Sequence, residues 1–169
     1  AKSPLKLIPH KLSNGDYHKL HGMRMLAIYL SEIAGQEVWI ANIYGYTGGH
    51  TDLEAAQATD EIIAVAIEEI GKKAKKCPVL LVGDLNADAE DLPTLQDLIN
   101  EQRWTDCGAC AHMWGGVSCQ ATCLAPNSSE ATRRDFMIAS PLWFKAVTGF
   151  QVTECDSFPV HQPIDTKVR

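Results

Sequence analysis

Long hydrophobic runs are missing from this sequence: no stretch approaches the roughly 18 consecutive apolar residues that a membrane-spanning helix needs. The first residues also lack the apolar segment of a secretory signal, so we expect an intracellular protein with reduced thiols. Internal repeats and low-complexity tracts are absent, and the 169 residues have an ordinary globular composition, which predicts one domain. The sequence does not begin with methionine, so we expect a processed end or a piece of a longer chain.

An excess of positive charge is missing too. The formal net charge is −6, which argues against a general nucleic-acid coat, because such proteins are basic. A nuclease remains compatible with this charge, since metal-binding carboxylates themselves add negative charge.

Residues 78–86, with the sequence PVLLVGDLN, organise the rest of the chain. An apolar run bounded by turn residues is typical of a strand that is buried on both faces. Asp84 and Asn86 follow its terminal glycine and are two residues apart, so an extended backbone would direct both side chains to one side. The pattern fits a polar site at a strand end, and it fits an Asx turn equally well.

The other predicted elements alternate between strands and helices. Thr51 and Glu54 have the spacing of a capping box, and Pro93 suits the first position of a helix. The lysines near residue 76 suit the carboxyl end of the first helix, and DNA contact there is the alternative. We predict strands at 23–30, 37–44, 136–139 and 145–153, helices at 51–76 and 93–104, a loop at 105–130 and an irregular segment at 1–22. This order predicts a layered α/β domain with a mixed sheet and flanking helices.

Four separated blocks together resemble the endonuclease/exonuclease/phosphatase superfamily, whose fold is the two-sheet sandwich of deoxyribonuclease I. The blocks are residues 42–45 (NIYG), 82–86 (VGDLN), 133–136 (RRDF) and 160–164 (VHQPI). The loop that follows the first block looks most like the branch of apurinic endonucleases and retroelement nucleases. The resemblance covers only the second half of the family's domain, which implies that residues 23–169 are the carboxyl-terminal part and that the amino-terminal half is missing.

The resemblance implies a role for each matching residue. Asp84 would orient or deprotonate the attacking water, and Asn86 would hold the phosphate and that water. Asp135 would hydrogen-bond the ring of His161, which would donate to the phosphate. Tyr44 would donate its hydroxyl to a phosphate or leaving oxygen. These five residues are the predicted catalytic set.

The resemblance also implies substrate contacts and a metal. Thr47 and Arg134 are the predicted substrate-binding residues, although Thr47 falls where the apurinic branch often has asparagine. Arg134 and Asp135 would also fit a surface ion pair. Asp84 and Asn86 are the predicted ligands of Mg²⁺ or Mn²⁺, in an incomplete site. The expected reaction is metal-dependent phosphodiester hydrolysis, with DNA as the expected substrate.

Two departures from the family pattern bear on activity. The family usually has aspartate immediately before the histidine, and here Val160 takes that position. The family's metal-binding glutamate is also missing, because the upstream glutamates Glu32 and Glu37 lie in a predicted hairpin. We therefore expect weak metal binding and an inactive chain as it stands. The alternatives are a non-catalytic remnant or binding module, and a hydrolase of phospholipids or inositol phosphates. If half of a sandwich is missing, one sheet face is exposed and association through it is expected.

Four cysteines and one histidine offer a competing site. Cys107 and Cys110, with Cys119 and Cys123, have zinc-like spacing around His112. The gap between the two pairs is short, and free buried thiols are therefore favoured over zinc.

Overall fold

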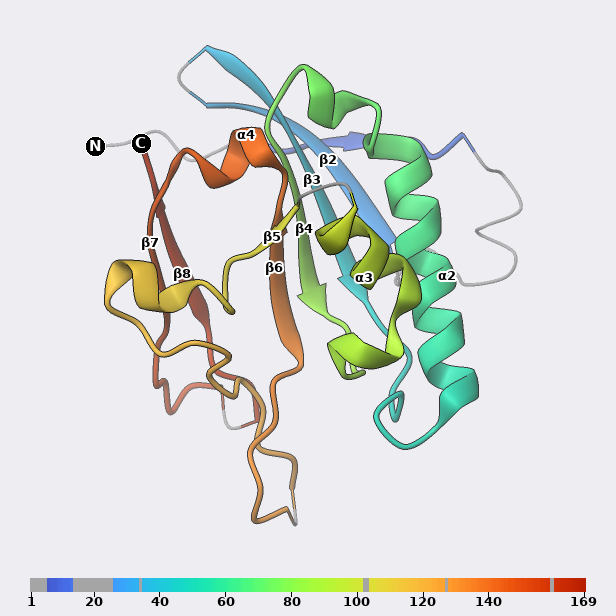
Figure 1. The fold of residues 1–169 in the computed structure, drawn as a ribbon, viewed down its shortest axis with the longest axis vertical. Coiled ribbons are helices and arrows are strands. Elements are labelled where there is room, and N and C mark those ends of the chain that lie inside the picture. The colour runs from blue at the N-terminus through green and yellow to red at the C-terminus, as the bar shows by residue number, and fades with distance from the viewer. Residues whose placement is uncertain (1–5, 14–25, 34, 102–103, 127, 159) are drawn as a thin grey trace.

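The computed structural model describes residues 6–13, 26–33, 35–101, 104–126, 128–158 and 160–169. Within these residues the chain forms three layers: two helices, a six-stranded mixed sheet and a two-stranded sheet (Figure 1). The layered α/β architecture with a mixed sheet is as predicted. None of the described helices combines the length and the apolar character that crossing a membrane requires.

The large sheet has the strand order β1-β2-β3-β4-β6-β5. Among the strands of the described residues, only β3 and β4 run parallel, and helix α2 connects them, because parallel neighbours need a crossover. The strands are β1 (Ile8–His10), β2 (Leu26–Ile33), β3 (Gln36–Tyr44), β4 (Val79–Asp84), β5 (Thr105–Asp106) and β6 (Asp135–Ala139).

The predicted hairpin is confirmed as β2 and β3, although β2 extends three residues beyond the predicted end at Leu30. The first three residues of that predicted strand lie outside the described residues, as do residues 14–22 of the segment predicted to be irregular. Residues 8–10 of that segment are not irregular, because they pair with β2 as strand β1. A proline in such a short strand is compatible with its position at the edge of the sheet.

Helix α2 (Leu53–Ile70) begins and ends differently from the prediction. Its N-cap is Asp52 rather than Thr51: the Asp52 carboxylate accepts the backbone N–H of Glu54 at 2.9 Å, and Thr51 donates its hydroxyl to the Gly48 carbonyl. The helix ends at Ile70, and the lysines beyond it form a short 3₁₀ turn, η1 (Lys73–Lys75). Helix α3 (Pro93–Asn100) does begin at the predicted proline and ends four residues before Trp104.

The main core lies between the two helices and one face of the sheet. Alternate residues of β3 and β4 face the helices because side chains alternate across a strand. Fully buried members of this core include Ile62, Ile63, Ala66 and Ile70 from α2, Leu95 from α3, Ala41 from β3, and Val79 and Leu81 from β4. Full burial of each large aliphatic side chain contributes about 1.5–3 kcal/mol to folding.

The opposite face of the sheet is covered over β4, β6 and the first residues of β3, where Val38 is buried. The cover consists of β7 (Val147–Val152), β8 (Ile164–Val168), the short helix α4 (Pro141–Phe144) and the turn η3 (Ala111–Trp114). Strand β7 falls within the predicted strand at 145–153, whereas β8 and the short β5 and η3 in the predicted loop were not anticipated. A second 3₁₀ turn, η2 (Ala89–Asp91), leads into α3.

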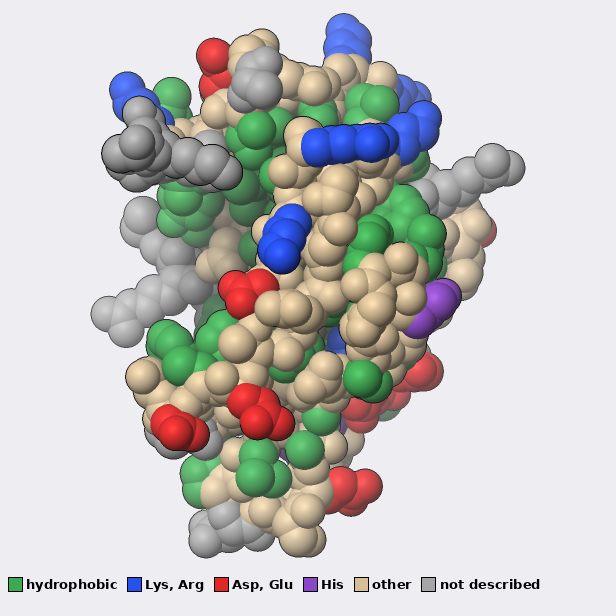
Figure 2. Space-filling view, turned by 90° about the vertical axis from the view of Figure 1, so that its left-hand side faces the viewer, with side chains coloured by type: hydrophobic (Ala, Val, Ile, Leu, Met, Phe, Trp, Pro, Cys, Tyr) green, Lys and Arg blue, Asp and Glu red, His purple; other side chains and the backbone are tan. Residues whose placement is uncertain are grey.

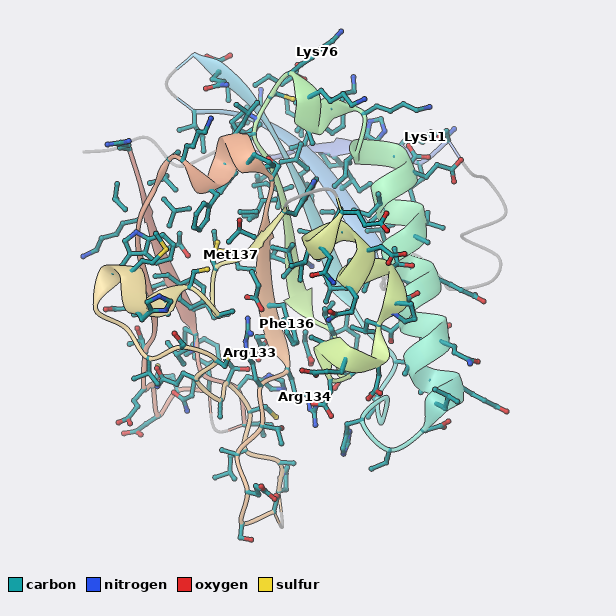
Figure 3. The ribbon with its side chains drawn as sticks, in the orientation of Figure 1. Lys11, Lys76, Arg133, Arg134, Phe136 and Met137 are labelled. Atoms are coloured by element: carbon teal, nitrogen blue, oxygen red, sulfur yellow. The ribbon has the colours of Figure 1, made fainter. Side chains whose placement is uncertain are left out.

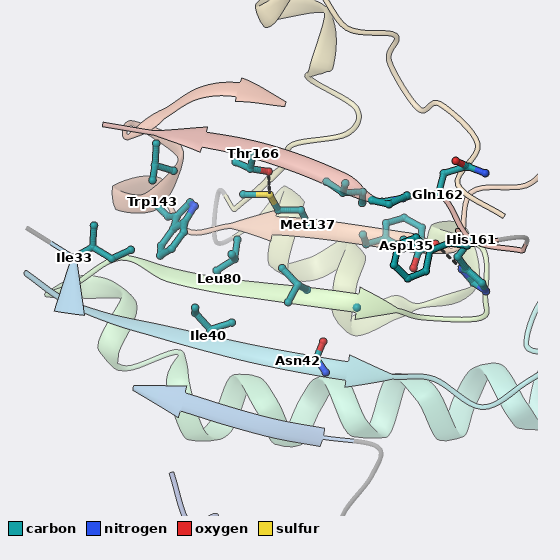
Figure 4. Close-up of a pocket in the computed structure, with 17 residues that line it drawn as sticks. Ile33, Ile40, Asn42, Leu80, Asp135, Met137, Trp143, His161, Gln162 and Thr166 are labelled. Atoms are coloured by element: carbon teal, nitrogen blue, oxygen red, sulfur yellow. Dashed lines mark hydrogen bonds and ion pairs between the residues drawn. The ribbon is translucent and has the colours of Figure 1, made fainter. Parts of the chain in front are cut away.

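A cleft of about 620 Å³ lies where the second sheet stops short of β2 and β3 (Figure 4). Its walls are mainly apolar: Ile40 of β3, Leu80 and Val82 of β4, Met137 of β6 and Ile164 of β8. The cleft continues to the carboxyl end of β4, where its lining includes the polar side chains of Asp135, His161 and Gln162.

Candidate active site

The strand register brings three predicted site residues to one end of the sheet. Tyr44, the last residue of β3, is paired with Asp84, the last residue of β4. Asp84 is paired in turn with Asp135, the first residue of β6. Paired residues on adjacent strands share a face, so the hydroxyl and the two carboxylates belong to one row. Tyr44 is the outermost, with 48% of its surface exposed.

Two glycines allow the exits of β3 and β4 to approach each other closely. Gly83 has φ +142°, and a Cβ atom there would lie 1.8 Å from the carbonyl oxygen of Ile43. A Cβ atom on Gly45 would lie 2.1 Å from the carbonyl oxygen of Leu85. Gly45 also donates its N–H to the Asp84 carbonyl at 2.7 Å. These contacts fix the backbone that carries Tyr44 and Asp84.

His161 joins this row from the segment that leads into β8. Its Nδ1 atom lies 2.9 Å from Oδ2 of Asp135 (Figure 4). Its Nε2 atom lies 3.6 Å from Oδ2 of Asp84. The first contact is a hydrogen bond, and the second is too long for one. In the part of the chain that the structure describes, these three residues are the only cluster of histidine, cysteine and acidic side chains whose ligand atoms all lie within 4.8 Å of one another.

The electrostatics of Asp84 are unusual for a carboxylate near a surface. Burial raises the pKa of its carboxyl above the ordinary value of 3.8, and the neighbouring charge of Asp135 also raises it. The hydrogen bond from the N–H of Asn86, and then the charges of His161 and Arg134, act in the opposite direction. Asp84 therefore holds its proton more tightly than an isolated aspartate, which favours a role as a base near neutral pH.

Of the two interpretations that the sequence left open at Asn86, the structure has the Asx turn and not the extended backbone. The φ of Asn86 is +51°, a left-handed conformation that asparagine tolerates better than most residues. Its backbone N–H donates to Oδ1 of Asp84 at 3.0 Å, and its side-chain Nδ2 donates to the carbonyl of Gly45 at 3.0 Å. The Asx turn and the polar strand end are thus the same feature, and Asn86 holds Asp84 and the β3 exit together.

The two predicted substrate contacts have different surroundings. The Arg134 side chain is only 6% exposed, and its guanidinium forms an ion pair of 2.7 Å with Asp88. Arg134 and Arg133 lie near the same end of β6, whereas Lys76 lies at the opposite end of the molecule (Figure 3). The ion pair that the sequence allowed was between Arg134 and Asp135 at the surface. Arg134 pairs with Asp88 instead, and the arginine side of this pair is buried. Thr47 is exposed in the loop after β3.

The side-chain oxygens at this end of the sheet are ligands of the kind that a hard divalent cation binds. Asp84 and Asp135 supply carboxylate oxygens of the kind that Mg²⁺ and Mn²⁺ take, and a nearby cation would offset the repulsion between the two carboxylates. On the face shown in Figure 2, lysine and arginine side chains lie mostly in the upper half and acidic side chains mostly in the lower half. The donors therefore fit a cation, although they do not complete its coordination.

The missing family carboxylates are not replaced by the upstream glutamates. Glu37 pairs with Glu32 at the turn of the hairpin, and its carboxylate accepts the indole N–H of Trp39. Glu37 and Tyr44 stand near opposite ends of β3, roughly 23 Å apart at about 3.3 Å per residue of extended strand. Val160 contributes a backbone carbonyl to Leu124.

Sequence reasoning missed several residues beside the site. Asn42 lines the cleft two positions before Tyr44, and strand alternation from Tyr44 would have found it. Gln162 lines the cleft after His161, and Cys123 forms an isolated β-bridge with His161. Burial, together with the charges of Asp84 and Asp135, raises the pKa of the Cys123 thiol. No local pattern in the sequence connects Cys123 with the other residues.

The cysteines of the predicted zinc-like cluster are free thiols. Cys107 is fully buried, and burial raises the pKa of its thiol to about 12. The exposed Cys119 instead accepts a long contact from Arg133, whose guanidinium also binds both carboxylate oxygens of Asp106. Cys123 lies apart from these residues, in its bridges to Thr132 and His161.

Comparisons with known proteins identify the fold. No protein-family model and no curated protein matches the sequence. Among solved structures, a 3′ phosphatase from Neisseria bound to a product DNA hairpin matches 96% of this chain and 72% of its own, at 16% identity and a TM-score of 0.69. An AP endonuclease from Archaeoglobus fulgidus matches the same shares at 14% identity and a TM-score of 0.68.

An endonuclease/exonuclease/phosphatase family protein from Leptotrichia buccalis C-1013-b matches 85% of this chain at 14% identity and a TM-score of 0.54. The chain spans 53% of the length of that protein. The agreement in fold with all three proteins, at low identity, shows that the chain has the deoxyribonuclease I-like fold of the endonuclease/exonuclease/phosphatase proteins.

Proposed function

We propose that the chain carries the phosphate-binding end of a divalent-metal-dependent phosphodiester hydrolase that acts on DNA. The observation that supports this most strongly is the position of His161 between two carboxylates, bonded to Asp135 and facing Asp84. A histidine held by one carboxylate and directed at a second polar group is an arrangement suited to proton transfer.

We assign each side chain a role from this arrangement. The Asp135 carboxylate accepts the Nδ1–H of His161 and thereby fixes the ring so that Nε2 faces the cleft. A protonated Nε2 would donate to a phosphate oxygen. Asp84, whose pKa burial raises, would orient the attacking water and accept its proton. The exposed hydroxyl of Tyr44, at the end of the row, would donate to a phosphate or leaving oxygen.

A bound Mg²⁺ or Mn²⁺ would polarise the phosphoryl group and stabilise the leaving oxygen. Asp84 and Asp135 are the residues whose carboxylates would hold it. Asn86, which the Asx turn ties to Asp84, is the further proposed ligand. Without the family's glutamate this set is small, so we propose that the 169 residues alone bind metal weakly and do not turn over substrate.

DNA is the proposed substrate because two of the similar structures are named for DNA processing, a 3′ phosphatase with a DNA hairpin and an AP endonuclease. Thr47 remains a proposed contact, since it is exposed in the loop that follows Tyr44. For Arg134, the buried ion pair with Asp88 favours support of the loop after Asp84 over direct contact with substrate.

We further propose that polypeptide outside the 169 residues covers the open part of the sheet in the working protein. The apolar cleft beside Ile40 and Val82 supports this, because soluble proteins rarely expose a large continuous apolar surface to water. A covering segment would also be the source of further metal ligands.

The deciding experiment measures metal-dependent cleavage of abasic and intact duplex DNA. It compares the 169-residue chain with the same chain extended by the upstream part of its reading frame. We expect cleavage only by the extended form, with losses of about 10²–10⁴-fold in Asp84→Asn and His161→Gln. Asp91→Asn, an exposed aspartate on η2, is the matched control and should keep full activity.

The competing function is a non-catalytic binding module, which Val160 and the distant glutamates favour. Absence of cleavage by both forms, with DNA binding retained, would establish that function instead. Cleavage that survives both Asp84→Asn and His161→Gln would place the active site elsewhere.

A further inference from the structure

Thr122 is a buried residue that contacts both sides of the candidate site. Only 1% of its surface is exposed, and it precedes the described bridge between Cys123 and His161. It lies in the loop between η3 and β6, 13 residues before Asp135 and 39 residues before His161. The proposed function above gives Thr122 no role.

The hydroxyl of Thr122 binds the start of β6. Its Oγ1 atom accepts the backbone N–H of Arg134 at 3.1 Å and that of Asp135 at 3.0 Å. Successive N–H groups on a strand normally point in opposite directions, so their convergence on one oxygen defines the local backbone at Asp135. The direction in which the Asp135 carboxylate leaves β6 therefore depends on this hydroxyl.

The backbone of Thr122 binds the segment that carries the histidine. Its carbonyl accepts the N–H of Gln162 at 2.7 Å, directly after His161. Two residues on, the N–H of Leu124 donates to the Val160 carbonyl at 2.9 Å, directly before His161. His161 is thus held between two backbone hydrogen bonds from the same short segment.

We propose that Thr122 is a positioning residue that sets the hydrogen bond between Asp135 and His161. The hydroxyl fixes the carboxylate, and the peptide unit of the same residue fixes the chain beside the imidazole. The chemical importance of the bond between Asp135 and His161 rests on the proposed function. The positioning of these two residues by Thr122 does not depend on it. A shift of either partner would lengthen the 2.9 Å contact and release the ring from its single orientation.

Ser140 provides a matched comparison at the other end of β6. It is fully buried, and its Oγ atom also accepts two backbone N–H groups, from Val79 at 3.0 Å and from Trp143 at 3.5 Å. Removal of either hydroxyl leaves buried N–H groups without their acceptor, so both changes lower stability. Only removal of the Thr122 hydroxyl acts at the strand end that carries Asp135.

The test is NMR of His161 in the 169-residue chain labelled with ¹⁵N in the histidine ring. We expect the wild type to show one tautomer, with the proton on Nδ1 and its signal shifted by the bond to Asp135. Thr122→Val, which keeps the shape but removes the hydroxyl, should lose that signal and show mixed tautomers. Thr122→Ser should restore it, and Ser140→Ala should keep it despite a comparable fall in Tm.

A wild-type His161 signal in Thr122→Val, or its loss in Ser140→Ala, would overturn the proposal. If Thr122→Val does not fold, hydrogen exchange of the wild type decides: the amides of Arg134 and Asp135 should be protected, and fast exchange of both would refute the hydroxyl's role. In an active extended form, cleavage should fall about 10-fold or more in Thr122→Val and recover in Thr122→Ser. Absence of cleavage in every form would remove the proposed function and leave the NMR result unaffected.

Discussion

Asp84 and Asp135 lie directly opposite each other on β4 and β6, so two carboxylates share one end of the sheet. Each is only partly open to solvent, with side-chain exposures of 11% and 22%. Two like charges in such a place are costly to the folded state, and this cost can be measured.

We predict that Asp84→Asn stabilises the folded chain at pH 7. Burial raises the pKa of the Asp84 carboxyl in the folded state, so its ionisation opposes folding and stability is lost as the pH rises through that pKa. The amide removes this penalty, and we expect Tm to increase by about 2–4 °C, or about 1 kcal/mol in a domain of this size.

Thermal unfolding of both proteins between pH 3 and pH 8 checks this. The difference in Tm should be full above the folded pKa and disappear below the ordinary value of 3.8, where both states bind the proton. A lower Tm for Asp84→Asn at pH 7 would show that hydrogen bonding, rather than burial, dominates at this carboxylate.

We predict that Mn²⁺ stabilises the wild type and not the Asp84→Asn variant. A cation at about ten times its Kd raises the unfolding free energy by about 1.4 kcal/mol. The measurement is Tm with increasing Mn²⁺, followed by EDTA, which should reverse the gain. Equal stabilisation of the two proteins would mean that the cation binds at another place, and the exposed Asp91→Asn is the control for general charge effects.

Gly83→Ala should destabilise the chain by more than about 3 kcal/mol, because a positive φ and a backbone clash act together. The new Cβ would lie 1.8 Å from the Ile43 carbonyl oxygen. Gly35 is the matched control: its φ is +81° and a Cβ there would meet nothing within 4 Å, so Gly35→Ala should cost only about 1 kcal/mol. Urea unfolding of the two variants separates the clash from the strain, and equal losses would contradict the close approach of β3 and β4.

The thiols should differ sharply in reactivity with iodoacetamide at pH 8. Cys119 is exposed and should be labelled within minutes, whereas Cys107 should stay unlabelled until the chain unfolds, since it is fully buried and its pKa is raised to about 12. Mass spectrometry of labelled peptides gives the order. Protection of both residues that EDTA abolishes would instead restore the zinc interpretation.

We predict that the isolated chain associates through the uncovered sheet face and binds a hydrophobic dye. Ile40→Lys should reduce both effects, because Ile40 lines the apolar cleft. Leu53→Lys is the control, since Leu53 is 65% exposed at the start of α2 and does not line the cleft. Light scattering that shows a sharp monomer, with no dye bound, would contradict this prediction.

The sequence predicted the elements whose pattern is local. The apolar run before Gly83 predicted β4, and the β-branched and aromatic residues at 37–44 predicted β3, because strands favour these residue types. Strands β1 and β8 left no such trace: β1 contains a proline, and β8, with the sequence IDTKV, is mostly polar and short. Both are stabilised by pairing with a neighbour rather than by their own pattern.

The site was predictable only in part. The closeness of Asp135 and His161, 26 residues apart, followed from resemblance to a family and not from spacing. The backbone at Asn86 was left open, because two residues at a spacing of two can be extended or form an Asx turn and the residue types favour both; the structure has the turn. Thr122 and Cys123 reach the site through tertiary contacts alone.

The candidate site is divided between the two sheets. Asp84 and Asp135 belong to the large sheet, whereas His161 stands on the segment entering β8, in the small sheet. The distance between Nε2 of His161 and the Asp84 carboxylate therefore also depends on the position of the small sheet relative to the large one. Any substitution or bound segment that tilts the small sheet will move the imidazole of His161, even when it contacts no polar residue.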